Sequence, residues 1–369
     1  MSPKLAPDVL LSARELETTA RWLISHQQPS GEILWSHNGK SDPWDMVHAA
    51  MGLATLGRVD AARAAYRFLA STQEPSGGWA AERVGGVVTR VSQESNHAAY
   101  IAMGLWHAQL AAPNVDFLAE LWPTLDRAMD WVVSLQLPSG AMAWASKHGK
   151  VWRSPLITGS SSIHGSLVCA LRIAERLDHD RPAWRKALHK LGRVLRDEKD
   201  VFTNTDLPEK PGRYSMDWYY PVLGGALRDE AARARLLDPV LKPAFVEEGV
   251  GCRCVRDQPW YTVAETCELV LALDAAGLPE RAREVLGWTR AQRTENGAYW
   301  TGATHPEGVI FPEDEQTTWT ASAVILATDA VRDQTATSAF FRDLGEIEEP
   351  ARHERTRRAP YGVPTQPAE

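Results

Sequence analysis

The chain has 369 residues, of which 44% are hydrophobic, so it can bury one large core. Its net charge of −7 argues against nucleic acid and against an anionic membrane surface as partners. We read no signal peptide, no apolar run long enough to span a membrane and no disulfide framework in the four cysteines, so we expect a cytoplasmic protein that binds a small molecule. The oligomeric state stays open.

A short motif recurs along the chain, each time at the end of a segment with helical periodicity. The copies are WLISHQQPSGEI (22–33), FLASTQEPSGGW (68–79), WVVSLQLPSGAM (131–142) and, more loosely, WTRAQRTENGAYW (288–300). Pro cannot continue a helix, Gly accepts a positive φ, and a Gln amide can hydrogen-bond the unpaired carbonyls at a helix end. The motif therefore indicates a structural staple between helix and loop, and its residues are not predicted to be catalytic.

Six segments that are apolar on most sides alternate with these amphipathic helices, and helices apolar all round are buried. The predicted inner helices span 42–57, 94–110, 161–177, 216–232, 259–277 and 313–331. Six such hairpins predict an all-α fold, an (α/α)6 toroid with an inner and an outer ring of helices. An open solenoid is the alternative, but long loops before the inner helices favour closure. We expect residues 1–345 to form one toroid domain and 346–369, rich in Pro, Arg and Glu, to be a disordered tail.

The motif FLASTQEPSGGW resembles the QW repeat of the prenyltransferase and squalene-oxidase repeat superfamily. That superfamily includes squalene-hopene cyclases, class II diterpene cyclases and protein prenyltransferase β subunits, and the resemblance extends as a repeat pattern from residue 10 to about 332. It also extends to actinobacterial prenyltransferase-like proteins. The resemblance implies an α/α toroid with its site at one mouth or in the central cavity.

Two site motifs of that superfamily are altered here. Protein prenyltransferases hold zinc with Asp-x-Cys and a later His, whereas this chain has Glu265-Thr266-Cys267 and, in the region of the His, Trp319. No metal site is therefore predicted and no cofactor is certain, although the acidic residues could hold Mg²⁺. Class II cyclases use Asp-x-Asp-Asp-Thr, whose middle Asp protonates the substrate. The sequence at 313–317 is EDEQT, which implies that Glu315 takes the position of the acid.

In a closed ring the first turns of the inner helices converge at one mouth, and here these turns are polar. Carboxylates and imidazoles can exchange protons with a substrate; the candidate catalytic residues are Glu315, Glu265, Asp217, Asp45, Glu94, His48 and His97. Aromatic and cationic side chains can bind a substrate. The candidate binding residues are Trp44, Tyr100, His164, Trp218, Tyr219, Tyr220, Arg253, Arg256, Trp260, Tyr261 and Trp319.

Three functions are compatible with this mouth. The first is an isoprenoid-processing enzyme, similar to a class II terpene cyclase or a prenyltransferase, in which Glu315 protonates the substrate and aromatic faces stabilise carbocations. The second is a carbohydrate-active enzyme, a glycoside hydrolase, lyase or epimerase, using Asp45 with Glu265 or Asp217 with Glu315 as a carboxylate pair. The third is a toroid that binds a ligand without catalysis. The resemblance places the isoprenoid enzyme first.

Overall fold

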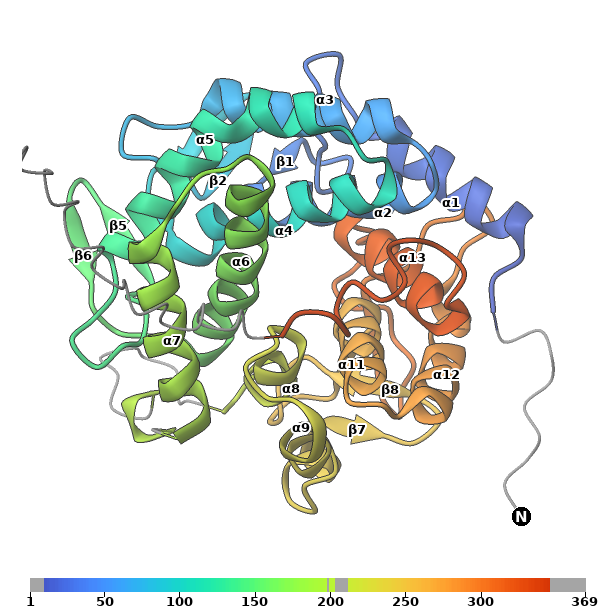
Figure 1. Cartoon of the computed structure of the whole chain (residues 1–369). Coiled ribbons are helices and arrows are strands. Elements are labelled where there is room, and N and C mark those ends of the chain that lie inside the picture. Colours follow the sequence, from blue (N-terminus) through green and yellow to red (C-terminus); the bar gives the residue numbers. More distant parts are fainter. Residues whose placement is uncertain (1–9, 198, 203–211, 346–369) are drawn as a thin grey trace, which may run out of the picture.

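The computed structural model describes residues 10–197, 199–202 and 212–345. Six helices surround the centre of the molecule and six lie outside them (Figure 1). The inner helices are α2 (Pro43–Thr55), α4 (Ser95–Ala111), α6 (Ile157–Arg176), α8 (Met216–Leu223), α11 (Val263–Ala275) and α13 (Thr318–Arg332). The outer helices are α1 (Ala13–Ser25), α3 (Val59–Thr72), α5 (Val115–Ser134), α7 (Pro182–Asp197), α9 (Asp229–Leu236) and α12 (Pro279–Trp288). Short helical segments lie at α10 (Leu241–Phe245), Lys199–Phe202 and Thr289–Gln292.

The inner helices form a closed ring. Each one contacts the next in the order α2, α4, α6, α8, α11 and α13, and α13 returns to contact α2. Every residue of α11 from Val263 to Asp274 is buried, as expected of a helix enclosed on all sides. The outer helix α7 instead buries only one face, through Trp184, Leu188 and Leu191. The predicted (α/α)6 toroid is therefore confirmed, and the solenoid is excluded.

The fourth inner helix is shorter than predicted. The sequence pattern predicts one helix over 216–232, but α8 ends at Leu223 and the outer helix α9 begins at Asp229. Two glycines cause the break. Gly225 has a φ of +77°, and a Cβ there would lie 1.8 Å from the carbonyl oxygen of Leu344; one on Gly224 would lie 2.0 Å from that of Ser161. A helix with side chains at these positions could not pass its neighbours so closely.

The last two inner helices begin later than predicted. α13 starts at Thr318, because the Thr317 hydroxyl accepts a hydrogen bond from the Thr320 amide and caps the helix. Glu315 is consequently in a loop and not in a helical first turn. α11 starts at Val263, and Trp260 and Tyr261 belong to a strand in front of it.

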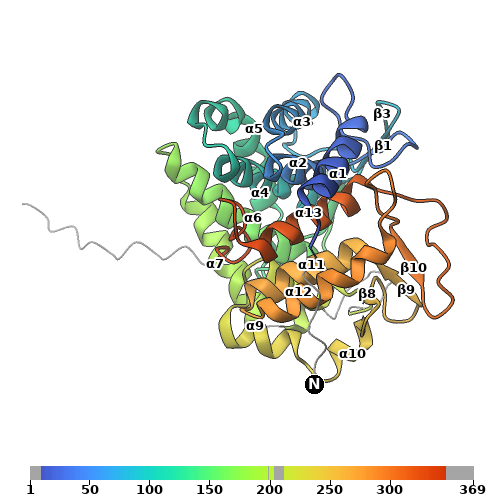
Figure 2. The ribbon, with the colours of Figure 1, turned by 90° about the vertical axis from the view of Figure 1, so that its right-hand side faces the viewer.

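The loops before the inner helices contain three small antiparallel sheets, which the sequence analysis did not predict. The first sheet consists of β1 (Lys40–Ser41), β2 (Glu82–Val84) and β3 (Val87–Arg90). The second consists of β4 (Gln93–Glu94), β5 (Ala145–Lys147) and β6 (Lys150–Trp152). The third has the strand order β10 (Gly302–Thr304), β9 (Trp260–Thr262), β8 (Gly251–Arg253) and β7 (Val246–Glu247). The strands labelled in Figure 2 gather at one end of the ring, to which the inner helices point their N-termini. They form a rim around the polar first turns.

The recurring motif joins neighbouring outer helices. Gln73 donates from Nε2 to the carbonyl of Gly77, at 2.8 Å, and to that of Thr124 in α5, at 2.9 Å. Gln27 bonds Gly31 and Ala61 of α3 in the same way, and Gln136 bonds Gly140 and Ala187 of α7. The amide thus reaches the next outer helix, and not the end of its own helix as the sequence analysis assumed.

In the loosest copy of the motif, Arg293 stands where the others have Gln. The bridge between Arg293 and Tyr299 matches the bridge between Gln27 and Ile33. Its guanidinium donates to the carbonyl of Glu15 in α1, at 3.1 Å, so this copy joins the last outer helix to the first. The motif therefore stabilises the closure of the outer ring.

We expect Gly77→Ala to lower the free energy of unfolding by more than about 2 kcal/mol. Gly77 has a φ of +102°, and an added Cβ would lie 2.3 Å from the carbonyl oxygen of Arg127 in α5. Gly85 is the matched control, because its φ is +57° but nothing lies within 4 Å of an added Cβ. Gly85→Ala should cost about 1 kcal/mol from backbone strain alone. Urea unfolding of both variants tests this; equal losses would argue against the motif as a staple.

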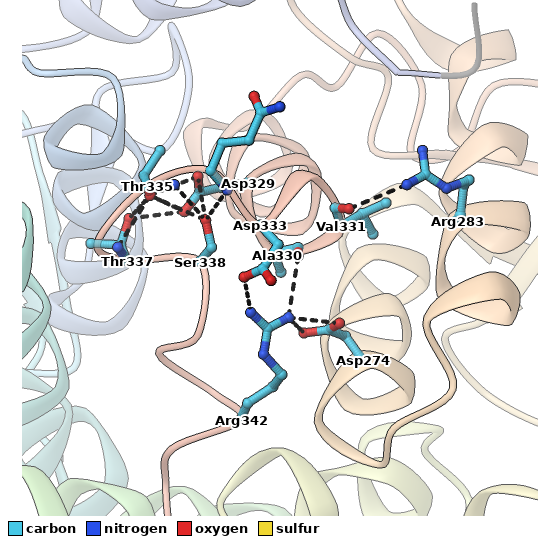
Figure 3. Close-up of polar contacts among 11 residues, drawn as sticks. Asp274, Arg283, Asp329, Ala330, Val331, Asp333, Thr335, Thr337, Ser338 and Arg342 are labelled. Atoms are coloured by element: carbon cyan, nitrogen blue, oxygen red, sulfur yellow. Dashed lines mark hydrogen bonds and ion pairs between the residues drawn. The ribbon is translucent and has the colours of Figure 1, made fainter. Parts of the chain in front are cut away.

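Residues 333–345, here called the plug, cover the end of the ring opposite the strands. Phe340 and Leu344 are buried, and Phe340 contacts His107 of α4 edge to face. Arg342 donates to Asp274 at the end of α11, at 2.8 Å (Figure 3). Polar contacts also hold the start of the plug, since Asp329 accepts hydrogen bonds from Thr335, Thr337 and Ser338 (Figure 3). The plug thus covers the end of the ring away from the rim of strands.

Candidate active site

A buried carboxylate, Glu268, lies at the centre of the polar end of the ring. Both of its oxygens accept hydrogen bonds, from the Tyr219 hydroxyl at 2.6 Å and from the Tyr220 hydroxyl at 2.8 Å. His48 approaches it from α2, with Nε2 4.0 Å from Glu268 Oε1. Three inner helices thus converge on one carboxylate whose side chain is 0% exposed.

Burial raises the pKa of Glu268 to about 8, against the two tyrosine hydrogen bonds that favour the ionised form. The charge of Glu265 contributes to the same rise. Trp319 of α13 also lies close enough to stabilise the ionised form, but its indole N–H is not in hydrogen-bonding geometry. Burial lowers the pKa of His48 to about 3, so this imidazole is neutral at physiological pH.

Asp45 and Glu265 lie one helical turn nearer the mouth than His48 and Glu268. Each is the third residue of its helix, Asp45 in α2 and Glu265 in α11, and these two helices flank α13 in the ring. Asp45 precedes His48 by three residues, and Glu265 precedes Glu268 by three, which corresponds to a rise of about 4.5 Å along an α-helix. Asp45 is 8% exposed and Glu265 is 5% exposed, so both are largely shielded from solvent.

The environment of Asp45 favours its protonated form. Burial raises its pKa well above the usual range, and the nearby charges of Asp42, Glu268 and Glu315 raise it further, while Lys40 opposes them. Its backbone amide donates to the side chain of Asp42, which caps α2. Asp45 therefore lies at a helix N-terminus in an environment that favours a carboxylic acid able to give a proton.

Aromatic rings form one wall of the site. Trp44 stacks on Tyr100 of α4 with ring centroids 4.0 Å apart and an angle of 14° between the planes. His48 is nearly parallel to Tyr100, at 5.9 Å, and Tyr220 lies 6.1 Å from Trp44. These stacked rings lie largely buried beside the carboxylates, with Trp44 6% and Tyr100 2% exposed.

A second polar group lies at the start of α4. His97 Nε2 is 3.5 Å from Glu94 Oε2, and Arg90 on the rim is 3.2 Å from the other carboxylate oxygen. The indole N–H of Trp144 also donates to Glu94, at 3.2 Å. His97 in turn lies 6.1 Å from Trp44, so this group adjoins the aromatic wall.

The structure therefore brings together most of the predicted residues. Those that gather around Glu268 or along the adjoining wall are Asp45, Glu265, Glu94, His48, His97, Trp44, Tyr100, Tyr219, Tyr220 and Trp319. Glu268 itself was missed. Its signal was the spacing of three from Glu265, which places both carboxylates on one face of the same helix.

Two predicted carboxylates lie at the edge of this group. Glu315, in the loop before α13, lines a surface recess with His37 and Asn38, and its charge reaches Asp45. Asp217 accepts a hydrogen bond from the Thr158 hydroxyl of α6, at 2.7 Å. Burial raises the pKa of Asp217, opposed by that hydrogen bond.

The remaining predicted residues lie elsewhere. Trp218 points outward, donating to the carbonyl of Arg235 at 2.8 Å, and His164 lies two turns down α6 beside the carbonyl of Gly224. Arg253 and Tyr261 bond each other at 2.6 Å within the third sheet. Arg256 is exposed in a loop, and Trp260 stacks on Phe311 at 4.3 Å.

Two absences concern only the residues that the structure describes. Within the ranges given above, His, Cys, Asp and Glu side chains form no group of three or more that could hold a metal ion. In the same ranges, no helix has both the length and the apolar character that crossing a membrane requires.

Comparison with known proteins identifies a relative along nearly the whole chain. The chain is 42% identical over 335 residues to the MMP endo-(1,4)-3-O-methyl-alpha-D-mannosidase of Mycolicibacterium hassiacum, covering 91% of each protein. A drimenyl diphosphate synthase of Streptomyces showdoensis is 30% identical over 133 residues, which are 34% of this chain and 22% of that enzyme. No protein-family model matches the chain.

Solved structures of low sequence identity share the fold. A wild-type glycosidase superposes with a TM-score of 0.65 at 14% identity, covering 91% of this chain and 100% of its own. A D-mannose isomerase reaches 0.67 at 11% identity, covering 87% and 96%. The cellobiose 2-epimerase of Spirochaeta thermophila reaches 0.59 at 16% identity, with the same coverage. At these identities the similarity concerns the toroid alone.

These comparisons correct the sequence analysis. The assignment to the terpenoid cyclase and prenyltransferase superfamily is wrong, because the relative that spans the chain is a mannosidase. The predicted isoprenoid function is wrong for the same reason. The cyclase-like and prenyltransferase-like descriptions are wrong with it. The expectation of an enzyme is supported, and the relative that spans the chain is of the glycosidase type named there as the alternative. The QW-like motif misled because its Gln and Gly join outer helices, a structural task independent of the chemistry at the mouth.

Proposed function

The chain belongs to the family of the MMP endo-(1,4)-3-O-methyl-alpha-D-mannosidase, and from this we propose that it is an endo-acting glycoside hydrolase. Its substrate would be a chain of α-(1→4)-linked mannose carrying 3-O-methyl groups. The observation that carries the proposal, beside the family, is the pair of buried carboxyls at equal depth on α2 and α11, Asp45 and Glu265.

The two carboxyls have separate roles in this proposal. Asp45, whose pKa burial raises well above the usual range, is the general acid that protonates the glycosidic oxygen. Glu265 is the carboxylate that acts on the anomeric centre, either through water or directly. Glu268 touches neither reacting atom; it holds Tyr219 and Tyr220 in place beneath the pair.

The aromatic wall supports a sugar as substrate. Trp44 immediately precedes Asp45 and is held by its stacking on Tyr100, so its indole is the ring against which the C–H face of a pyranose would pack. Polar groups beside it, such as Glu94 and His97, can bind hydroxyls. A 3-O-methyl group makes the sugar more apolar, which suits a site lined by indole and phenol rings.

Product analysis tests the proposed function. The purified protein is incubated with 3-O-methylated α-(1→4)-mannan oligosaccharides, with unmethylated maltooligosaccharides and with prenyl diphosphates as comparison substrates. We expect the methylated mannan alone to be cleaved internally, giving oligosaccharides of intermediate length as the first products. Release of single sugars from one end would contradict endo action, and no cleavage of any glycan would contradict the proposed function.

A further inference from the structure

We propose that the stacked pair Trp144 and Trp152, on the rim of the ring, is an outer sugar-binding subsite of this enzyme. It would hold a pyranose ring of the glycan some distance from the bond that is cleaved. The inference rests on the proposed function for its substrate class, but it concerns a surface outside the candidate active site.

The pair is built by the second sheet. Trp152 ends β6 and pairs across the sheet with Ala145 of β5, directly after Trp144. The two indoles are stacked with centroids 5.4 Å apart and an angle of 28° between the planes. Trp152 is 37% exposed, so part of a large apolar ring faces solvent at the end of an edge strand. An edge strand normally carries charged or small residues there, because exposed apolar surface favours association.

Hydrogen bonds to neighbouring residues hold Trp144 in place. Its indole N–H donates to Glu94 at 3.2 Å, and its backbone amide donates to the carbonyl of Ser154 at 3.3 Å. A tryptophan whose polar edge is already bonded presents only its faces to a ligand. One face of the Trp144 indole stacks on Trp152. The two rings together form a platform that is ordered before a ligand binds.

A continuous set of contacts links this platform to the candidate catalytic centre. Trp144 bonds Glu94, Glu94 lies 3.5 Å from His97, and His97 lies 6.1 Å from Trp44. Trp44 immediately precedes Asp45. The path alternates apolar rings with carboxylate and imidazole groups, as a glycan alternates C–H faces with hydroxyls. A glycan chain that enters over the N-terminus of α4 is the occupant that this pattern fits.

The position of the platform suits an endo-acting enzyme. Such an enzyme binds several sugars on a long chain, and each additional subsite increases kcat/KM only for chains long enough to reach it. Trp152 lies beyond Glu94, at the outer end of the path, so it should affect long chains and leave short ones unaffected.

The test compares Trp152→Ala with two other variants. Trp152→Phe keeps an aromatic face, and Val87→Ala removes a 66% exposed apolar side chain from β3, elsewhere on the rim. The kcat/KM is measured on a series of 3-O-methylated α-(1→4)-mannan chains of increasing length. We expect Trp152→Ala to lose about tenfold on long chains and nothing on the shortest cleaved chain. Trp152→Phe should retain most of the activity, and Val87→Ala all of it.

An equal loss at every chain length, or no loss at any, would overturn the subsite. If the wild-type protein cleaves none of these chains, the proposed function has failed and binding decides the subsite alone. Calorimetry with the same chains then compares wild type and Trp152→Ala. A Kd that weakens about tenfold only for long chains supports the platform, whereas equal Kd values or an absence of binding overturn it.

Discussion

Replacing Asp45 by Asn should lower kcat by about a thousandfold on a methylated mannan while leaving the fold intact. The side chain is 8% exposed and Asn has nearly the same shape, so the loss would come from chemistry and not from packing. An amide cannot give a proton to the glycosidic oxygen at neutral pH. Glu265→Gln should cause a loss of similar size, because an amide can neither activate water nor attack the anomeric carbon.

A substrate with an activated leaving group separates the two roles. A nitrophenyl leaving group departs without protonation, so Asp45→Asn should recover much of its activity on an aryl glycoside of the same sugar. Glu265→Gln should not recover. Initial rates on both substrates, with circular dichroism as a check of folding, provide the measurement. Recovery by Glu265→Gln instead would exchange the two roles, and full activity of both variants on the mannan would refute the pair.

The ring architecture could be predicted because the sequence patterns that indicate it extend over many residues. Segments such as 94–110 and 161–177 are apolar on nearly every side, and only a helix enclosed by others satisfies that pattern. The strands could not be predicted in the same way. Elements of two to four residues, such as Gln93–Glu94, are too short for an alternating pattern, and their pairing is set by the helices on either side.

The candidate site was predicted in part, for a related reason. Asp45 and Glu265 were found because both occupy polar first turns, where a ring brings side chains together. Glu268 lies one turn deeper, in a run of apolar residues, and its tyrosine partners come from a helix about 50 residues away in the sequence (48 and 49). Trp218 was counted with Tyr219 and Tyr220, but one step along a helix turns a side chain by about 100°, so it faces outward.

Function was harder to predict than fold because the most conspicuous motif belongs to the scaffold. Gln73 and Gly77 allow two outer helices to approach closely, a task that does not depend on the reaction at the mouth. The acidic character of the mouth was the better guide. Asp45 and Glu265 on two inner helices, with Glu94 directly before a third, fit the recognition and hydrolysis of a sugar more closely than the binding of a hydrocarbon chain.

The ionisation of Glu268 should make the folded protein less stable as the pH rises. Burial raises its pKa to about 8 in the folded state, whereas in the unfolded chain the pKa returns to its ordinary value of 4.5. A raised folded-state pKa means that the folded protein holds the proton more tightly. The stability from this proton is fully present below about pH 4.5 and is lost as the pH rises to about 8, a change on the order of several kcal/mol.

Glu268→Gln removes this titration, so the free energy of unfolding of the variant should depend less on pH across the same interval. Urea unfolding of wild type and variant between pH 5 and 9 measures the difference, and subtraction cancels groups that lie too far from Glu268 to sense its charge. Tyr219→Phe is a second control, which keeps the Glu268 carboxyl but shifts its pKa. The Tyr219 hydroxyl stabilises the ionised form and lowers the pKa of Glu268, so its removal should raise that pKa and extend the loss of stability above pH 8. Parallel curves for wild type and Glu268→Gln would show that the carboxyl is ionised throughout, and that its two tyrosines outweigh its burial.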